Sequence, residues 1–244
     1  PINRRQRQMC IRDRYNLSMK KLLIICLVLL TGCTNANAKV NKIEHQDIFD
    51  QVQLSDYQNV MIVAHPDDET IWGGMHLLKD KYLVVCLTNG DNEIRSKEFK
   101  EVMKKTQNTG LILNYPDKTN GKRDNWKSSY QKIEDDLNYL LSKQHFNLVV
   151  THNPKGEYGH QHHKMTSAIV TSIAKDLAIT NNLKYFGLYY RKTNPILPMK
   201  PTFDDDLTKQ KLELADCYSS QKKVCHNLGH MFPYENWISY DEWH

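Results

Sequence analysis

The chain has 244 residues, of which 40% are hydrophobic and 25% are charged. These proportions predict a globular protein with a packed core and exclude an intrinsically disordered chain. The net charge of +5 does not indicate nucleic-acid binding, because residues 1–32 carry a net +6 and the remainder carries −1. A nucleic-acid partner would require a basic face on the folded part, so none is expected.

The segment from Met19 to Cys33 has the pattern of a bacterial lipoprotein signal. Two lysines precede nine apolar residues, Leu22 to Leu30, and the segment ends in Leu-Thr-Gly-Cys. Nine apolar residues are too few for a helix that spans a membrane, and the last four residues resemble a lipobox. We therefore expect lipidation at Cys33 and an extracytoplasmic protein held at the bacterial membrane by this lipid anchor.

The signal also divides the chain. Residues upstream of Met19 precede the expected start, and we exclude them from reasoning about the fold. The expected division is 1–18 as a non-native upstream extension, 19–32 as the signal peptide, 33–56 as the lipidated cysteine and its tether, and 57–244 as a single domain.

Three cysteines fall within the expected domain. Cys86 lies in an apolar run and is expected to be a buried thiol. Cys217 and Cys225 could form a disulfide in an oxidising compartment. Their spacing does not decide this, because pairing depends on geometry in the fold.

Apolar runs and helical periodicity alternate along the domain. Strands are predicted at 60–64, 82–87, 111–113, 146–151 and 185–190. Helices are predicted at 69–79, from an N-cap at Ser96 to near Gly110, and at 129–143, 162–177 and 207–218. Alternating strands and helices predict a Rossmann-like three-layer α/β fold with a mostly parallel sheet and helices on both faces. The first strand lacks a following Gly-x-Gly-x-x-Gly, so dinucleotide binding loses its main support.

Polar stretches follow four of these strands. Ligands of open α/β sheets bind beyond the carboxyl ends of the strands, so these loops are expected on one rim. They are Val-Ala-His-Pro-Asp-Asp-Glu at 63–69, Thr88 to Glu98, Asn114 to Gly121, and Thr151 to His163.

Two of the loops carry candidate metal ligands. His65 and Asp68 share a turn stiffened by Pro66, and His160 and His163 can share one face of a helix start. Each cluster has an ordinary explanation, since carboxylates suit the first turn of a helix and histidines occur in surface turns. Their shared rim favours a site of two histidines and one carboxylate with open positions for water and substrate.

The same residues resemble a known family. Ala-His-Pro-Asp-Asp-Glu at 64–69 matches the AHPDDE motif of the PIG-L/LmbE-like zinc-dependent N-deacetylases, and Gly-His-Gln-His-His at 159–163 resembles their G-H-x-D-H motif. Thr-Asn-Gly at 88–90 and the pair Arg95 and Glu98 match a recurrent pattern between the two motifs. The resemblance covers about residues 58–190.

The resemblance implies a role for six residues. His65, Asp68 and His163 would bind Zn²⁺, with Fe²⁺ as the alternative metal for two histidines and one carboxylate. Asp67 would be the general base on the metal-bound water. His160 would stabilise the oxyanion or protonate the leaving amine, and Arg95 would contact substrate.

The implied activity is hydrolytic removal of acetyl from an N-acetylglucosamine-type sugar or glycoconjugate, so that 57–244 would be a deacetylase domain. A catalytically impaired carbohydrate-binding lipoprotein, or an amidase for a non-sugar N-acyl amide, is the alternative. His162 stands where the family usually has Asp, and the H-x-x-H spacing favours His163 over His162 as ligand. Glu69 is expected only to begin the helix, and residues 217–244 either line the substrate mouth or pack as a tail.

Overall fold

The computed structural model describes residues 43–193 and 199–244. The expected signal peptide and the candidate lipidation site Cys33 lie outside these residues, so the membrane anchor stays a prediction. Within the described ranges, no helix is both long enough and apolar enough to cross a membrane.

Six strands form one twisted sheet in the order β3-β2-β1-β6-β7-β8. All neighbouring pairs are parallel except β7 with β8. The strands are β1 Asn59–Val63, β2 Leu83–Thr88, β3 Thr109–Tyr115, β6 Leu148–Thr151, β7 Leu183–Tyr185 and β8 Ile238–Ser239. A separate antiparallel pair is formed by β4 Lys118–Thr119 and β5 Lys122–Arg123.

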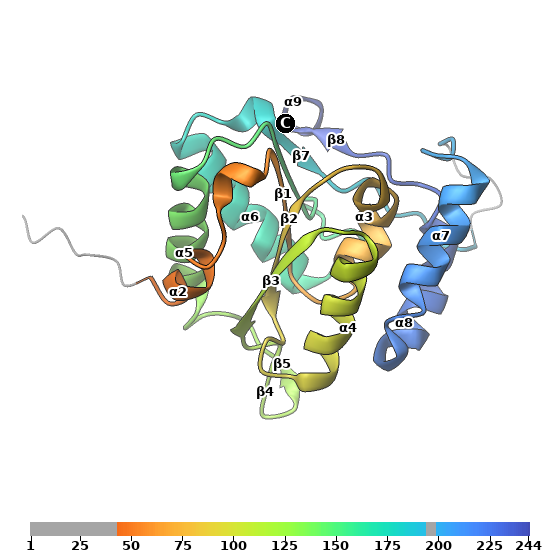
Figure 1. Ribbon diagram of the computed structural model, residues 1–244, viewed down its shortest axis with the longest axis horizontal. Coiled ribbons are helices and arrows are strands. Elements are labelled where there is room, and N and C mark those ends of the chain that lie inside the picture. Colours follow the sequence, from red (N-terminus) through yellow and green to blue (C-terminus); the bar gives the residue numbers. More distant parts are fainter. Residues whose placement is uncertain (1–42, 194–198) are drawn as a thin grey trace, which may run out of the picture. The chain divides into compact units, whose positions relative to one another are not determined.

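Helices cover both faces of the sheet, as Figure 1 shows. Helices α5 (Tyr130–Lys143) and α6 (Gln161–Asp176) pack on one face. The other face carries α3 (Asp68–Lys79), α4 (Glu93–Lys105), α7 (Asp205–Ala215) and α8 (Lys222–Leu228). The short helix α2 (Gln46–Phe49) contacts α5, and the short helix α9 (Tyr240–Trp243) contacts β7. The predicted Rossmann-like three-layer fold is confirmed.

The sheet is buried on both faces because its strands are apolar on both faces. In β2, Leu83 and Val85 belong to the core under α5 and α6, whereas Val84 and Cys86 belong to the core under α3 and α4. All six residues of β2 are buried. This is the pattern of a parallel strand between two helical layers.

The strand order creates a crevice at one place. From β1 the chain first builds β2 and β3 on one side, and then returns to place β6 on the other side of β1. Such a reversal separates the loops at the carboxyl ends of the two central strands, which is where open α/β sheets bind ligands. The loops after β1 and β6 therefore meet at the rim where the sequence predicts a site.

The structure corrects two predicted boundaries. The strand predicted at 185–190 ends at Tyr185, because the side-chain amide of Asn153 binds the carbonyl groups of Phe186 and Gly187 in place of a strand partner. The helix predicted to start at Ser96 starts at Glu93, since the side chain of Asn92 caps it by accepting from the backbone of Arg95.

Residues 43–56, which we expected to belong to a tether, pack on the domain instead. Phe49 is 1% exposed and lies in the core. The backbone N–H and the ring Nδ1 of His45 both form hydrogen bonds with the buried carboxylate of Asp136 on α5. The compact unit therefore includes residues before the expected boundary at 57.

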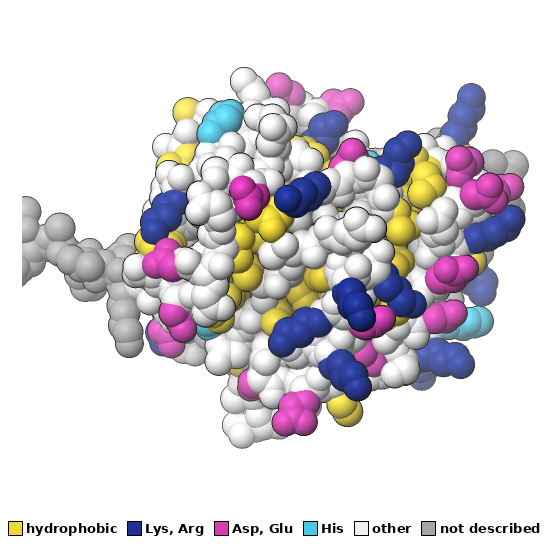
Figure 2. Space-filling view, in the orientation of Figure 1, with side chains coloured by type: hydrophobic (Ala, Val, Ile, Leu, Met, Phe, Trp, Pro, Cys, Tyr) yellow, Lys and Arg dark blue, Asp and Glu magenta, His cyan; other side chains and the backbone are white. Residues whose placement is uncertain are grey.

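Cys86, Cys217 and Cys225 are free thiols, so the 217–225 disulfide left open by the sequence does not form in this structure. Lys and Arg side chains are interspersed with Asp and Glu on the face shown in Figure 2, so this face carries charges of both signs.

Candidate functional site

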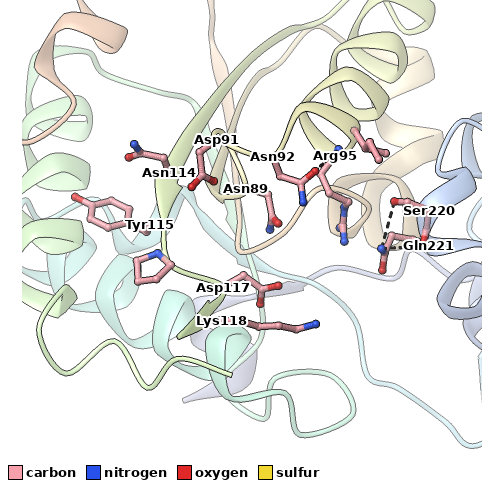
Figure 3. A pocket seen from close by; sticks show the side chains of 12 residues that line it. Asn89, Asp91, Asn92, Arg95, Asn114, Tyr115, Asp117, Lys118, Ser220 and Gln221 are labelled. Atoms are coloured by element: carbon pink, nitrogen blue, oxygen red, sulfur yellow. Dashed lines mark hydrogen bonds between the residues drawn. The ribbon is translucent and has the colours of Figure 1, made fainter. Parts of the chain in front are cut away.

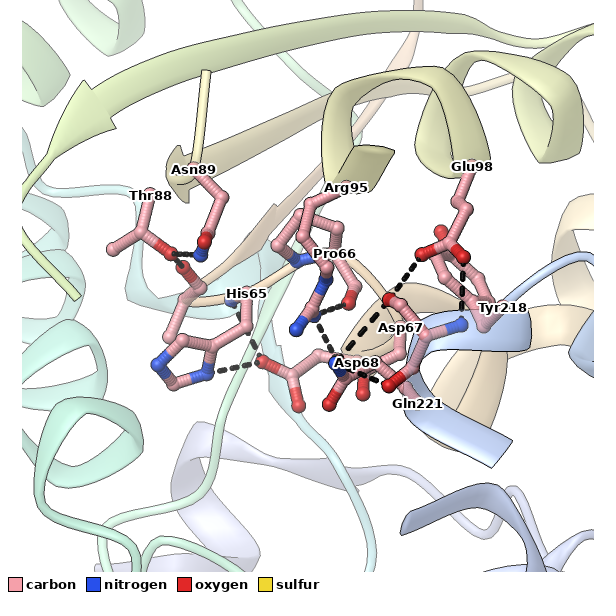
Figure 4. A network of polar contacts seen from close by, with 12 residues as sticks. His65, Pro66, Asp67, Asp68, Thr88, Asn89, Arg95, Glu98, Tyr218 and Gln221 are labelled. Atoms are coloured by element: carbon pink, nitrogen blue, oxygen red, sulfur yellow. Dashed lines mark hydrogen bonds and ion pairs between the residues drawn. The ribbon is translucent and has the colours of Figure 1, made fainter. Parts of the chain in front are cut away.

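The polar stretch after β1 forms a tight loop that leads into α3 (Figure 4). The backbone N–H of His65 donates to Oδ2 of Asp68 over 2.8 Å, and Nδ1 of His65 lies 3.2 Å from the same oxygen. Asp67 between them has φ = 123°, a conformation that is strained for any residue other than glycine. This bend lets Asp68 fold back onto His65.

The start of α6 enters the same crevice. Nε2 of the buried His163 lies 3.2 Å from Oδ1 of Asp68, and its Nδ1 lies 2.5 Å from Oε2 of Glu157. The carboxylate of Asp68 therefore lies between His65 and His163. The structure brings the three predicted metal ligands together from two loops that are far apart in the sequence.

The hydrogen pattern around His163 fits a bound cation. Burial alone would raise the pKa of Glu157, but the charges of His152 and His163 lower it to about 2, so its carboxylate can only accept. The Nδ1 of His163 therefore carries a hydrogen, and in the neutral ring, which is the form that binds a metal, Nε2 presents an electron pair. This Nε2 is buried without a hydrogen-bond partner although Asp68 is near. Tetrahedral zinc ligands at bond lengths of about 2.0–2.1 Å stand roughly 3.3 Å apart, close to the observed spacing.

Several combinations of these side chains could hold a metal ion. Among the described residues, the sets whose ligand atoms all lie within 4.8 Å of one another are His65–His160–His163, His65–Asp117–His162 and Asp68–His152–His163. The predicted set takes its members from the first and third of these. In the neutral ring of His152, which is the form that could bind a metal, Nε2 already accepts a hydrogen bond from the backbone of Ala64, which weighs against the third set. The assignment to His65, Asp68 and His163 stays a prediction.

Asp67, the predicted base, is buried at the same loop. Nη2 of Arg95 donates to the backbone oxygen of Pro66 and to Oδ1 of Asp67, the latter at 3.3 Å. Burial and the charge of Asp68 raise the pKa of Asp67 well above its usual value, and Arg95 opposes this rise. Arg95, predicted to contact substrate, is thus also bonded to the base and to the backbone beside it (Figure 4).

His160, the second predicted catalytic residue, lies against the predicted ligands. Its ring stacks on His163 with centroids 4.3 Å apart and meets His65 edge-on at 4.7 Å. Burial, followed by the charges of His163 and His65, lowers the pKa of His160 to about 2. Its Nδ1 is buried without a hydrogen-bond partner. An uncharged imidazole with a spare nitrogen can take part in proton exchange or donate a hydrogen bond.

A pocket of about 260 Å³ opens above these residues. Its walls include His65, Asp67, Asp68, Arg95, Asp117, Arg123, Tyr158, His160 and Gln221. A second pocket of about 600 Å³ shares Arg95, Asp117, Lys118 and Gln221 with it. Figure 3 shows the amide, carboxylate and ammonium groups that line this second pocket. The site therefore continues into a groove lined by these polar groups and by Ile94, Tyr115 and Pro116. Gln221 shows that part of the segment 217–244 borders the site.

Sequence reasoning missed three residues of the site, of which His152 and Glu157 are buried and Asp117 is partly exposed. His152 directly follows β6, Glu157 bridges His152 and His163, and Asp117 lies 3.5 Å from Nε2 of His65. All three fall in loops that were expected on the rim. One signal could have identified His152. Residues at the end of a buried strand remain buried, and a buried polar residue needs a hydrogen-bond partner.

Glu69 was predicted only to begin α3, and this is wrong. It is fully buried, and its carboxylate accepts hydrogen bonds from the backbone of Asp67 and from the hydroxyl groups of Thr70 and Tyr218. The Tyr218 contact is 2.5 Å long and joins the α3 loop to the chain after α7. Glu69 thus braces the loop that carries Asp67 and Asp68.

A Rossmann-like sheet with histidines and carboxylates gathered at its switch point defines an α/β protein of the class that includes deacetylase-type hydrolases. The chain belongs to the PIG-L family, described as GlcNAc-PI de-N-acetylase, whose profile matches residues 60–174. It is also similar to the uncharacterized protein L374 of Acanthamoeba polyphaga mimivirus, with 34% identity over 182 residues, which is 68% of this chain and 72% of that protein. The family resemblance that the motifs indicated is confirmed.

Proposed function

We propose that this protein is a metal-dependent N-deacetylase that removes acetyl from an N-acetylglucosamine-type sugar or glycoconjugate. His65, Asp68 and His163 would hold Zn²⁺, with Fe²⁺ as the alternative occupant. The observation that carries the proposal is the buried, unpartnered Nε2 of His163 beside the carboxylate of Asp68, which itself contacts His65. A cation satisfies all three groups at once.

The bound ion would polarise the amide carbonyl and make water a nucleophile near neutral pH. The protein's own residues would do the rest. Asp67 would take the proton of the attacking water on a carboxylate oxygen, since it lines the same pocket as Asp68 and His160. Arg95 fixes the position of Asp67 by bonding both its carboxylate and the preceding carbonyl group. His160, on the opposite loop, would stabilise the oxyanion or deliver a proton to the leaving nitrogen.

The walls of the pocket support a polar, hydroxyl-rich substrate. The groove beside the pocket is lined by Asn89, Asp91, Asn92, Asn114, Asp117, Lys118, Ser220 and Gln221. Amide side chains donate and accept hydrogen bonds and carboxylates accept them, so both pair well with sugar hydroxyl groups. The activity for which the family is named, GlcNAc-PI de-N-acetylase, acts on such an N-acetylated sugar.

The test is acetate release from a panel of N-acetylglucosamine compounds by the metal-loaded protein. Asp67→Asn should lower kcat by about 10²–10⁴-fold, since it removes the base and leaves the predicted ligands in place. Metal content is measured on the same samples. Asp206→Asn, which changes an exposed carboxylate on α7, is the matched control and should act like the wild type.

Four results would contradict the proposal. Full activity of Asp67→Asn with metal bound would exclude Asp67 as base. Undiminished activity after complete chelation would exclude a metal role. Acetate release only from non-sugar N-acyl amides would favour the amidase alternative, and metal binding without any turnover would favour a carbohydrate-binding protein.

A further inference from the structure

His162 is the residue at which this chain departs from its family's motif, and its surroundings fix how it hydrogen-bonds. The ring is fully buried and stacks on Trp126, with centroids 4.1 Å apart and an angle of 5° between the planes. Its Nε2 lies 2.7 Å from the backbone oxygen of Asp124. A carbonyl oxygen only accepts, so Nε2 of His162 carries a hydrogen. In the uncharged ring, Nδ1 therefore presents the electron pair.

This electron pair points at a predicted metal ligand. Nδ1 of His162 lies 3.0 Å from Nε2 of His65. Two nitrogens at this distance share one hydrogen. Because His162 has already placed its hydrogen on Nε2, the shared hydrogen belongs to His65. Nε2 of His65 is therefore a donor, and the second nitrogen of the His65 ring, Nδ1, is the one that faces Asp68 at 3.2 Å.

We infer that His162 is a positioning residue for metal binding: it accepts the Nε2 hydrogen of His65 and so directs the electron pair of His65 Nδ1 toward Asp68. This inference rests on the proposed function, which makes His65 a ligand. A metal-bound histidine commonly donates its other ring hydrogen to an oxygen acceptor, which fixes its tautomer and orientation. Here the acceptor is an imidazole, which the Asp124 carbonyl and the Trp126 ring hold in turn.

The second predicted histidine ligand has a parallel arrangement. His163 directs Nδ1 at the carboxylate of Glu157 and Nε2 at Asp68, so both ligand histidines are held by their outer nitrogens. The two acceptors differ in charge, since Glu157 is an anion and His162 is neutral. Asp117 is the nearest competing acceptor for His65, but at 3.5 Å it is farther than His162.

The variant His162→Phe tests this role. Phenylalanine keeps a flat ring for stacking on Trp126 and removes the acceptor. We expect one metal ion per chain in both proteins and a metal affinity about 10–100-fold lower in the variant, measured by competition with a chelator. His162→Asp restores an acceptor and should recover part of the affinity. His226→Phe, on the exposed side of α8, is the matched control and should leave the affinity unchanged.

A measurement on the wild type avoids dependence on folding of the variants. In the metal-loaded protein with ¹⁵N-labelled histidine, NMR should detect scalar coupling across the hydrogen bond between Nε2 of His65 and Nδ1 of His162. Unchanged affinity in His162→Phe, or an Nε2 of His65 without a hydrogen, would overturn the inference. Loss of a second metal equivalent in the variant would overturn it too, because His162 would then be a ligand in the set with His65 and Asp117.

The inference and the proposed function can fail separately. An affinity loss in His162→Phe with a wild type that releases no acetate would leave the positioning role intact and remove the deacetylase activity. Acetate release by the wild type, together with unchanged metal affinity in His162→Phe, would support the deacetylase activity and overturn the positioning role.

Discussion

At the scale of single residues, neighbouring residues of the loop after β1 have different structural roles. Asp68 folds back on His65 because Asp67 adopts a strained φ of 123°. The strain is opposed by Arg95 on one side and by Glu69, which accepts from the backbone of Asp67, on the other. Strained residues persist where surrounding contacts over-determine them, and they often occur at functional sites.

Arg95 offers a test of whether it positions the base or binds substrate. In Arg95→Gln the bonds to Pro66 and Asp67 are weakened, so we expect kcat to fall by about 10-fold or more with KM changed little, as for an interaction used only in the transition state. Steady-state kinetics with metal content measured in parallel would show this. A large rise in KM at unchanged kcat would indicate the substrate-binding role that the family motif implied.

How much of the site the sequence reveals depends on spacing. His65, Asp67 and Asp68 are adjacent in sequence and follow a recognisable strand, and His160 and His163 share a helix start, so the motifs identify them. Long-range partners are hidden. The contact of Tyr218 with Glu69 joins residues 149 positions apart, and no local pattern predicts it. The direction of His162, toward His65 and Trp126, is also set by packing and not by spacing.

At the scale of elements, α3 is held by side chains from the C-terminal part of the chain that bond to its backbone. Lys211 donates to the carbonyl of Ile71, and Glu235 accepts from the backbone of Met75. Trp237 likewise donates to the carbonyl of Trp72. The ion pair of Lys211 and Glu235, 2.6 Å long and fully buried, thus joins α7 and the C-terminal segment to the helix that follows the site.

Breaking this pair should destabilise the protein strongly. Lys211→Met leaves the carboxylate of Glu235 buried without its main counter-charge, and we expect the free energy of unfolding to fall by about 3–5 kcal/mol in urea titrations. The double variant Lys211→Met with Glu235→Gln should recover much of this loss. Lys209→Met, which breaks the exposed pair with Asp206, should change stability by less than about 0.5 kcal/mol. Equal effects at positions 209 and 211 would contradict the assignment.

The packing of α2 on α5 should depend on pH through His45. Burial alone would lower its pKa, but hydrogen bonds with Asp136 and Asn114 raise it above 6.5. Burial alone would raise the pKa of Asp136, but hydrogen bonds with His45 and Tyr115 lower it. The histidine's contribution is therefore complete below pH 6.5 and lost as pH rises through the raised pKa, and the carboxylate's is lost in acid.

The matching experiment compares the wild type with His45→Gln. We expect the wild type to be more stable by about 2 kcal/mol near pH 5–6, and this advantage should shrink as pH rises toward 9. Urea titrations at each pH would measure it. An advantage that grows with pH would show that His45 is neutral in the folded protein.

Helix boundaries were predictable where the apolar periodicity runs to both ends of the helix, even without a side-chain cap. The helices at 129–143 and 162–177 match α5 and α6 within one residue because apolar positions recur at helical spacing up to their ends. The strand at 185–190 was predicted because Tyr-Phe-Gly-Leu-Tyr-Tyr is strand-like in composition, but β7 ends at Tyr185. After Tyr185, the Asn153 side chain and close approach of Asn236 to Gly187 decide the backbone path.

At the scale of the whole molecule, the strand order of the sheet places β6 beside β1, so loops that are far apart in the sequence lie close together. The fold class followed from alternating strands and helices, since parallel strands with crossovers leave few topologies. The antiparallel β8 and the return of the chain to α3 had no counterpart in the pattern, because they are short and depend on contacts made by the C-terminal third.

The segment matched by the family profile, residues 60–174, should therefore not fold alone. Cutting after Asp176 removes β7, α7 and the residues that cover α3 and α4, including Tyr218 and Phe232 of that core. We expect residues 43–176 to lack cooperative urea unfolding and to bind a dye for exposed apolar surface, whereas 43–244 unfolds in one transition. A cooperative transition in the shorter chain would show that the C-terminal third is dispensable.

The Lys211–Glu235 pair also constrains how this sequence can diverge. Each charge is tolerable only while the other is present, so a single replacement at either position produces an unstable intermediate, even if the final pair of residues would be acceptable. The two positions are epistatic and should be exchanged together or retained together. Through α3, selection on a hydrolytic site thus extends to residues that substrate never touches.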